Sequence, residues 1–359
     1  MTDKNSESPD SQEPSRKDFE WEYCPSCGIK LPRVEGLRFC TKCGIDLVYI
    51  KEHKSLPPSQ VATTYQPQTY YRTYRETLSD DEILHTKGRR LWGNLPSIGL
   101  PLLAFIVMNG LILGIIFALV FIVPNINFVI SLISNPFFIV FSTLAELILI
   151  IIPLWYVRKY LRNPSLENRL DLLGFTIKGY NKNELFKEIL IGIAFAFIGI
   201  LLVAGASIAI EAFLRYALGI RIIREGPSSD VEYIITGMDV LVLILMILMM
   251  LFVVGPCEEI LFRGFMQRGL VRTLGDTWGI LITAIIFAAI HLVTLFFYIL
   301  NPVVFIILFI YLFAPYIAIS LMLGLMFRWR NENLIAVTVT HGVYNSLTLL
   351  IAFLFMLFY

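Results

Sequence analysis

The feature that most constrains this chain is a succession of apolar segments that begins near Leu95. Each is close to the length of about 20 residues that an α-helix needs to cross a bilayer. We expect seven spans, at approximately Pro96–Val123, Phe137–Val157, Ile189–Tyr216, Met238–Val254, Gly279–Leu300, Val303–Phe327 and Leu334–Phe358, the fourth running on into the helix that carries Glu258 and Glu259. The chain is 57% hydrophobic and 16% charged, so the sequence predicts an all-α polytopic membrane protein in contact with lipid.

Basic residues in the loops predict how the chain is oriented. Short loops rich in Lys and Arg stay in the cytoplasm. Such residues precede the first span, join the second to the third, and follow the fourth and the sixth: Lys87, Arg89 and Arg90; Arg158, Lys159, Arg162, Arg169, Lys178, Lys182 and Lys187; Arg268 and Arg272; Arg328 and Arg330. We therefore expect an integral protein of the cell membrane with a cytoplasmic N-terminus. A net charge of +1 gives no support for nucleic-acid binding.

Four cysteines precede the first span in two Cys-x-x-Cys pairs, Cys24 with Cys27 and Cys40 with Cys43, and a glycine follows each pair. Four thiolates at this spacing can hold a structural zinc ion. Two disulfides or free thiols are the alternatives, and a reducing cytosol favours zinc. We expect a disordered tail over residues 1–20, a zinc ribbon over 21–50 that recruits a protein partner, a flexible linker over 51–94 and the membrane domain over 95–359.

Three ionisable residues, Glu258, Glu259 and Arg263, follow the apolar stretch Val240–Val254. A charge at bilayer depth costs about 2.5–3.5 kcal/mol, so such residues usually face partners or a wet cavity. Glu259 and Arg263 lie four apart on one helix face, whereas Glu258 is turned by about 100° and stays available. Gly255-Pro256 predicts a kink beside Glu258, and packing alone is the other explanation for it.

Only two of the four histidines, His291 and His341, lie within the expected spans. His291 follows Phe287 by four residues and His341 precedes Asn345 by four, so each pair shares a helix face. Two intramembrane histidines beside a carboxylate pair indicate a functional site.

Three motifs thus occur in order on separate helices: Glu258-Glu259-x-x-x-Arg263, Phe287-x-x-x-His291 and His341-x-x-x-Asn345. Together they resemble the motifs of the CPBP intramembrane proteases, also called the CAAX protease or Abi family, and Asp171-Leu-Leu-Gly-Phe175 is similar to a weaker family feature. The resemblance implies an endopeptidase that cuts a peptide near the cytoplasmic face. Because the family includes enzymes that trim prenylated C-termini, lipidated or membrane-anchored peptides are the expected substrates.

The resemblance also implies a role for each motif residue. Glu258 would be the general base that activates water, assisted by His291, while His341 and Asn345 would stabilise the oxyanion. Glu259 and Arg263 would hold the base, with the substrate terminus as a further partner, and Phe287 would pack.

Other schemes are left open by the residues. Glu258, His291 and His341 could form a catalytic zinc site, although attack by glutamate-activated water needs no metal. Cys257 beside the base suggests a thiol mechanism, which family members do not need. A scaffold or bacteriocin-immunity factor that recruits a partner through the zinc ribbon is the main alternative function, and a proton-coupled transporter is a weaker one.

Two features have no place in this scheme. Glu146 is a single carboxyl group in the second span, with no role that the family supplies. In addition, loop charge places Glu258 near the cytoplasmic end of its span, whereas His291 would lie about 18 Å along a span that begins at Gly279.

Overall fold

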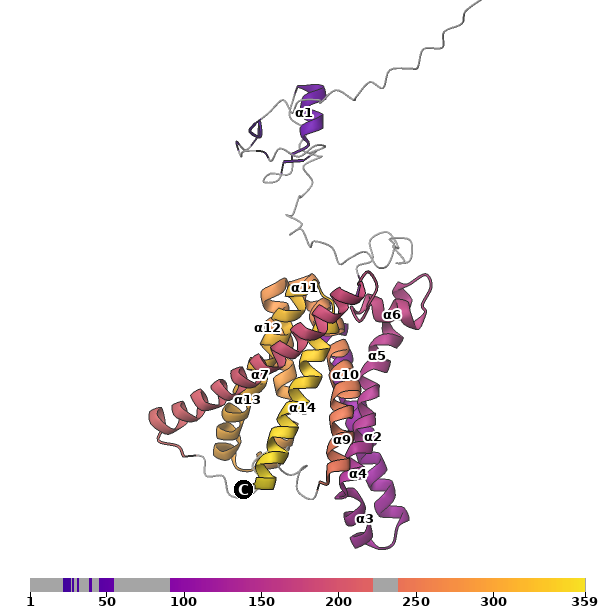
Figure 1. Cartoon of the computed structure of the whole chain (residues 1–359), viewed down its shortest axis with the longest axis vertical. Coiled ribbons are helices and arrows are strands. Elements are labelled where there is room, and N and C mark those ends of the chain that lie inside the picture. Colours follow the sequence, from indigo (N-terminus) through magenta and orange to yellow (C-terminus); the bar gives the residue numbers. More distant parts are fainter. Residues whose placement is uncertain are drawn as a thin grey trace, which may run out of the picture. The chain divides into compact units, whose positions relative to one another are not determined.

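The structure, a computed structural model, describes residues 22–26, 28, 31, 39–40, 45–54, 91–221 and 238–358. The predicted tail over residues 1–20, most of the predicted linker, Cys27 and Cys43 lie outside these ranges. The chain divides into two units, Met1–Arg72 and Thr73–Tyr359, which are described separately (Figure 1).

In the N-terminal unit, two of the four predicted zinc ligands are buried in one small cluster. Cys24 and Cys40 pack with Leu31 and Leu47. The amide of Gly28 donates to the carbonyl of Cys24 at 2.9 Å, and the positive φ of 69° at Gly28 folds the chain back after the first cysteine pair. Helix α1 (Leu47–His53) lies after the second cysteine pair in the sequence.

The second unit is helical, as predicted. Its elements are α2 (Asn94–Ile122), α3 (Ile126–Ile133), α4 (Pro136–Ser142), η1 (Thr143–Glu146), α5 (Leu147–Val157), η2 (Arg158–Tyr160), α6 (Leu166–Leu172), α7 (Lys182–Ala217), α9 (Val240–Met249), η3 (Met250–Val254), α10 (Gly255–Glu259), η4 (Ile260–Gln267), α11 (Arg268–Leu274), α12 (Asp276–His291), η5 (Val293–Tyr298), α13 (Pro302–Trp329) and α14 (Ile335–Phe358).

Among the described residues, six helical segments are long and apolar enough to cross a membrane, which confirms the fold class with one fewer long span than predicted. The expected fifth span, Gly279–Leu300, is the difference. Helix α12 ends at His291 after 16 residues, and the 3₁₀ turns of η5 continue the chain. Helix α7 is the longest. Its 36 residues extend about 54 Å, well beyond a hydrocarbon core of about 30 Å, and it crosses the other helices obliquely (Figure 1).

The predicted interruption at Gly255-Pro256 takes the form of π-helical turns. The fourth span is one helical run, Val240–Leu274, in which η3 and η4 are π-helical and flank α10. The amide of Gly255 bonds to the carbonyl of Met250, five residues back. Since Pro256 has no amide hydrogen, a widened turn lets the helix continue past it.

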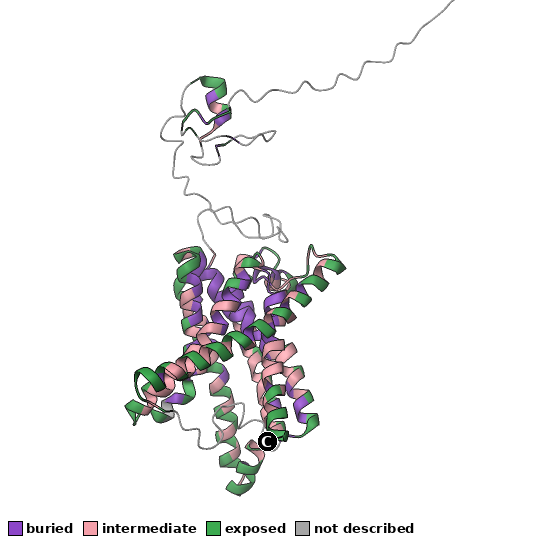
Figure 2. Ribbon diagram, turned by 60° about the vertical axis from the view of Figure 1, so that its left-hand side comes forward, coloured by how far each residue is buried: buried purple, intermediate pink, exposed green. Residues whose placement is uncertain are grey.

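The most completely buried part of the unit surrounds η4, toward the end that carries α11 (Figures 1 and 2). The Asp171–Phe175 stretch packs directly on this segment. A Cβ on Gly264 would lie 2.5 Å from the carbonyl oxygen of Leu173, and the amide of Leu334 donates to the carbonyl of Gly174 at 2.9 Å. These contacts fix the position of the N-terminus of α14 relative to η4.

Candidate active site

The fourth span and helix α12 form a tight helical hairpin that places Glu258 and His291 at the same depth in the membrane. The fourth span continues 15 residues beyond Glu259 to Leu274, so Glu258 is not at the end of its span as predicted. Helix α12 returns directly after Gly275. Glu258 lies about 24 Å of helix before Leu274, and His291 lies about 22 Å beyond Asp276. The mismatch in depth expected from the sequence therefore disappears.

A close helix contact brings His341 to the same place. A Cβ on Gly342 would lie 3.0 Å from the Cα of Leu251 and 3.0 Å from the carbonyl oxygen of Met250. A Cβ on Gly255 would lie 3.1 Å from the Cα of Gly342. Because both glycines lack side chains, α14 lies directly against the segment that carries Glu258.

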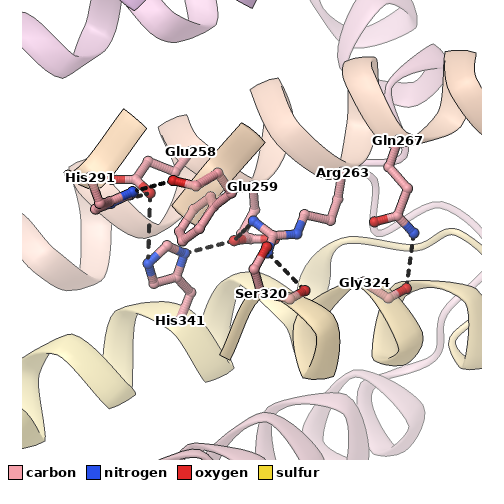
Figure 3. A network of polar contacts seen from close by, with 9 residues as sticks. Glu258, Glu259, Arg263, Gln267, His291, Ser320, Gly324 and His341 are labelled. Carbon is pink, nitrogen blue, oxygen red and sulfur yellow. Dashed lines mark hydrogen bonds and ion pairs between the residues drawn. The ribbon is translucent and has the colours of Figure 1, made fainter. Parts of the chain in front are cut away.

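Three polar atoms converge at the centre of the site (Figure 3). The Oε2 atom of Glu258 lies 3.8 Å from Nε2 of His291 and 3.9 Å from Nε2 of His341. These separations are too long for direct hydrogen bonds, but a water molecule can bridge them. The same Oε2 atom is buried and has no hydrogen-bond partner among the described residues.

The partner of each Nδ1 atom defines how each histidine can act. Nδ1 of His291 lies 2.8 Å from the carbonyl oxygen of Phe287, which can only accept a hydrogen bond. Nδ1 of His341 lies 2.6 Å from Oε1 of Glu259. In both rings Nδ1 therefore carries the hydrogen, and Nε2 points toward Glu258.

Glu259 and Arg263 form a fully buried pair, and both side chains are 0% exposed. Nη1 of Arg263 donates to Oε1 of Glu259 at 2.9 Å, and Nη2 donates to Oγ of Ser320 at 2.9 Å. The oxygen that receives Arg263 also receives His341. Oε1 of Glu259 thus contacts both Arg263 and His341, and the predicted role of the pair in holding the base and the substrate terminus stays a prediction.

An aromatic wall completes the site. The Phe287 ring packs as predicted: its centroid is 4.3 Å from that of His291 and 4.7 Å from the guanidinium carbon of Arg263. The Tyr316 ring lies 4.9 Å from that of His291. Tyr316 and Ser320, both on α13, were not predicted as site residues. Their spacing of four residues in a mostly apolar part of the helix was the available indication.

Two other residues considered from the sequence lie differently. Asn345 is half-buried one turn beyond His341 on α14, and its side chain makes no hydrogen bond within the described part of the chain. Cys257 is buried in an apolar cluster with Leu149, Leu261 and Phe262.

The arrangement of the side chains bears on whether the site can hold a catalytic metal. Among the described residues, no group of three or more His, Cys, Asp or Glu side chains is arranged to hold an ion.

Comparison with known proteins agrees with the motifs. Residues 240–347 match the family model described as type II CAAX prenyl endopeptidase Rce1-like, and this segment contains Glu258, His291, His341 and Asn345. No curated protein and no solved structure matches the chain. The match covers less than a third of the 359 residues, so the limits predicted for the domains remain predictions. Residues 240–347 are thus similar to the type II CAAX prenyl endopeptidases, which agrees with the resemblance of the three motifs to the CPBP intramembrane proteases.

Proposed function

We propose that the protein is an intramembrane endopeptidase of the glutamate type, which hydrolyses a peptide bond in lipidated or membrane-anchored substrates near the cytoplasmic face. The observation that carries the proposal is the convergence of Oε2 of Glu258 with the Nε2 atoms of His291 and His341. The cytoplasmic N-terminus remains a proposal from loop charge.

Hydrolysis begins with a water molecule held between Glu258 and His291. The water oxygen attacks the scissile carbonyl carbon while Glu258 accepts one of its protons. His291 suits the assisting role because its Nδ1 hydrogen is held by a neutral main-chain carbonyl, which leaves the Nε2 lone pair free to orient the water. Glu258 then passes the proton to the leaving nitrogen as the C–N bond breaks.

His341 is suited to the oxyanion. The carboxylate of Glu259 at its Nδ1 supports a charged ring, whose Nε2–H can donate to the developing negative charge. The buried group of Glu258, Glu259 and Arg263 carries one excess negative charge, which a proton on His341 neutralises. Asn345 lies one turn further on the same helix face and is the proposed second donor.

Substrate approach is most open beside His291. Its side chain is 24% exposed, against 9% for Glu258 and 5% for His341. We therefore place the scissile bond between this histidine and Glu258, with the buried pair behind His341.

The test is cleavage by the reconstituted full chain of matched prenylated and unprenylated C-terminal peptides. Loss of a general base typically lowers a rate by about 10²–10⁴-fold, so Glu258→Gln should reduce kcat/KM by that order. Glu211→Gln is the matched control, because Glu211 is exposed on α7. Loss of activity with chelator in the Cys24→Ser variant, which lacks the structural zinc proposed below, would refute the glutamate type. A folded wild type that cleaves neither peptide would favour the scaffold or immunity function.

We further propose a structural zinc ion held by Cys24, Cys27, Cys40 and Cys43. The burial of Cys24 and Cys40 in one cluster and the turn at Gly28 support it. Metal analysis of the full chain should find one zinc, lost in Cys24→Ser and kept in Cys257→Ser. A zinc content that Cys24→Ser leaves unchanged would refute it. The partner recruited by this unit would be sought with the zinc-loaded chain.

A further inference from the structure

Glu146 is a half-buried residue whose carboxyl group the mechanism above does not use. It ends η1, a short 3₁₀ turn that interrupts the second span between α4 and α5. Its Oε2 atom is buried and has no hydrogen-bond partner among the described residues. A buried polar atom without a partner is uncommon in a native structure and calls for an explanation.

The fold places Glu146 beside the active site. Elements η1 and α5 contact η3 and α10, the turns that precede and contain Glu258. The neighbouring residues Ala145 and Leu149 pack in the apolar cluster that includes Cys257. The Oε2 atoms of Glu146 and Glu258 are both buried, and neither has a hydrogen-bond partner among the described residues.

Glu146 differs from Glu258 and Glu259 in its charged neighbours. Glu259 has Arg263 and His341 as partners, and Glu258 faces both histidines. Within the described ranges, no cation forms an ion pair with Glu146. A carboxylate at bilayer depth with no cationic partner is costly, and two nearby buried carboxyl groups resist being ionised together.

We propose that Glu146 is a positioning residue for Glu258, and that the two carboxyl groups hold one proton between them. When Glu146 carries this proton, Glu258 is ionised and can act as the base. When the proton lies on Glu258, this residue cannot accept a proton from water and the enzyme is inactive. The shared proton is not consumed, because Glu258 returns the water proton to the leaving nitrogen. This inference rests on the proposed peptidase function.

The kinetic test compares the pH dependence of kcat/KM in the wild type, Glu146→Gln and Glu146→Asp. Removal of the second carboxyl group should move the acidic limb of the pH profile to lower pH. In Glu146→Asp, the acidic limb of the pH profile should lie near that of the wild type. Glu211→Gln removes an exposed carboxyl group from another span and should shift nothing. A folded Glu146→Gln enzyme with the wild-type profile would overturn the proposal.

A second measurement does not depend on activity. Infrared spectroscopy follows the C=O stretch of protonated carboxyl groups as pH changes. Glu146→Gln should lower the pH at which the band of Glu258 disappears, and Glu258→Gln should do the same to the band of Glu146, because coupling between two sites is reciprocal. Independent titration of the two bands would overturn the coupling even if the enzyme cleaves peptides. If no peptide is cleaved but each variant shifts the other band, the peptidase function fails and the carboxyl pair stands.

Discussion

Substitution of Gly342 by alanine tests whether a close helix contact sets the active-site geometry. The new Cβ would lie 3.0 Å from both the Cα of Leu251 and the carbonyl oxygen of Met250. Both are main-chain atoms, so no side-chain rotation can relieve the contact. Reaching 3.4 Å, where ordinary contacts begin, requires α14 to move by about 0.4 Å. His341 precedes Gly342 and must move with it.

The magnitude follows from this displacement. A misplacement of about 1 Å can cost about 10²-fold in rate, so a shift of about 0.4 Å should lower kcat/KM by roughly 5- to 10-fold. Overpacking should also lower the free energy of unfolding by about 1–3 kcal/mol. Neither effect changes a charge, so the shape of the pH profile should stay the same.

Peptide cleavage in proteoliposomes and thermal unfolding in detergent measure the two effects. Gly205→Ala is the matched control, because a Cβ at this helical glycine on α7 meets nothing within 4 Å. It should leave activity unchanged. Wild-type rate and stability in Gly342→Ala would show that the contact with η3 does not position His341.

Three further variants address the scaffold around the site. Arg263→Met leaves Glu259 without its guanidinium and should destabilise the protein by about 3–5 kcal/mol in thermal or denaturant unfolding; a neutral result would refute the buried ion pair. Ser320→Ala removes one acceptor from the same guanidinium, and its cost of about 1–3 kcal/mol should vanish when combined with Arg263→Met. Gly174→Ala should lower the free energy of unfolding more than Gly275→Ala. Both glycines have positive φ, but only a Cβ on Gly174 would meet a main-chain atom, 2.3 Å away. Equal losses in the two variants would leave backbone strain as the sole cause.

The membrane fold was predictable because apolar length alone identifies a spanning helix, and five of the seven expected spans agree, to within a few residues at their ends, with helices that are long enough to cross. The expected fourth span overlaps a sixth such segment, whose extension to Leu274 was missed. Its polar residues Gln267, Arg268 and Arg272 resemble a loop in sequence, yet they are helical. Burial of Arg268 against main-chain carbonyls and Glu332 makes this extension stable, and no local pattern reveals such partners.

The candidate site was predictable at its motif residues and less so between them. Helical spacing correctly placed Glu259 with Arg263, because a separation of four residues is a local property. The contact between Glu259 and His341 joins residues 82 positions apart and depends on the approach of two helices. Ser320 was not predicted for the same reason, because its partner Arg263 lies on another helix.

The two histidines differ in how readily mutation can disturb them. Nδ1 of His291 is held by the main-chain carbonyl of Phe287, which every amino acid at position 287 would still provide. Nδ1 of His341 is held by the side chain of Glu259, which one codon change can remove. Sequence drift can therefore reset the protonation of His341 while the tautomer of His291 persists. Altered specificity or rate in variants of this protein should arise more easily on the His341 side of the site.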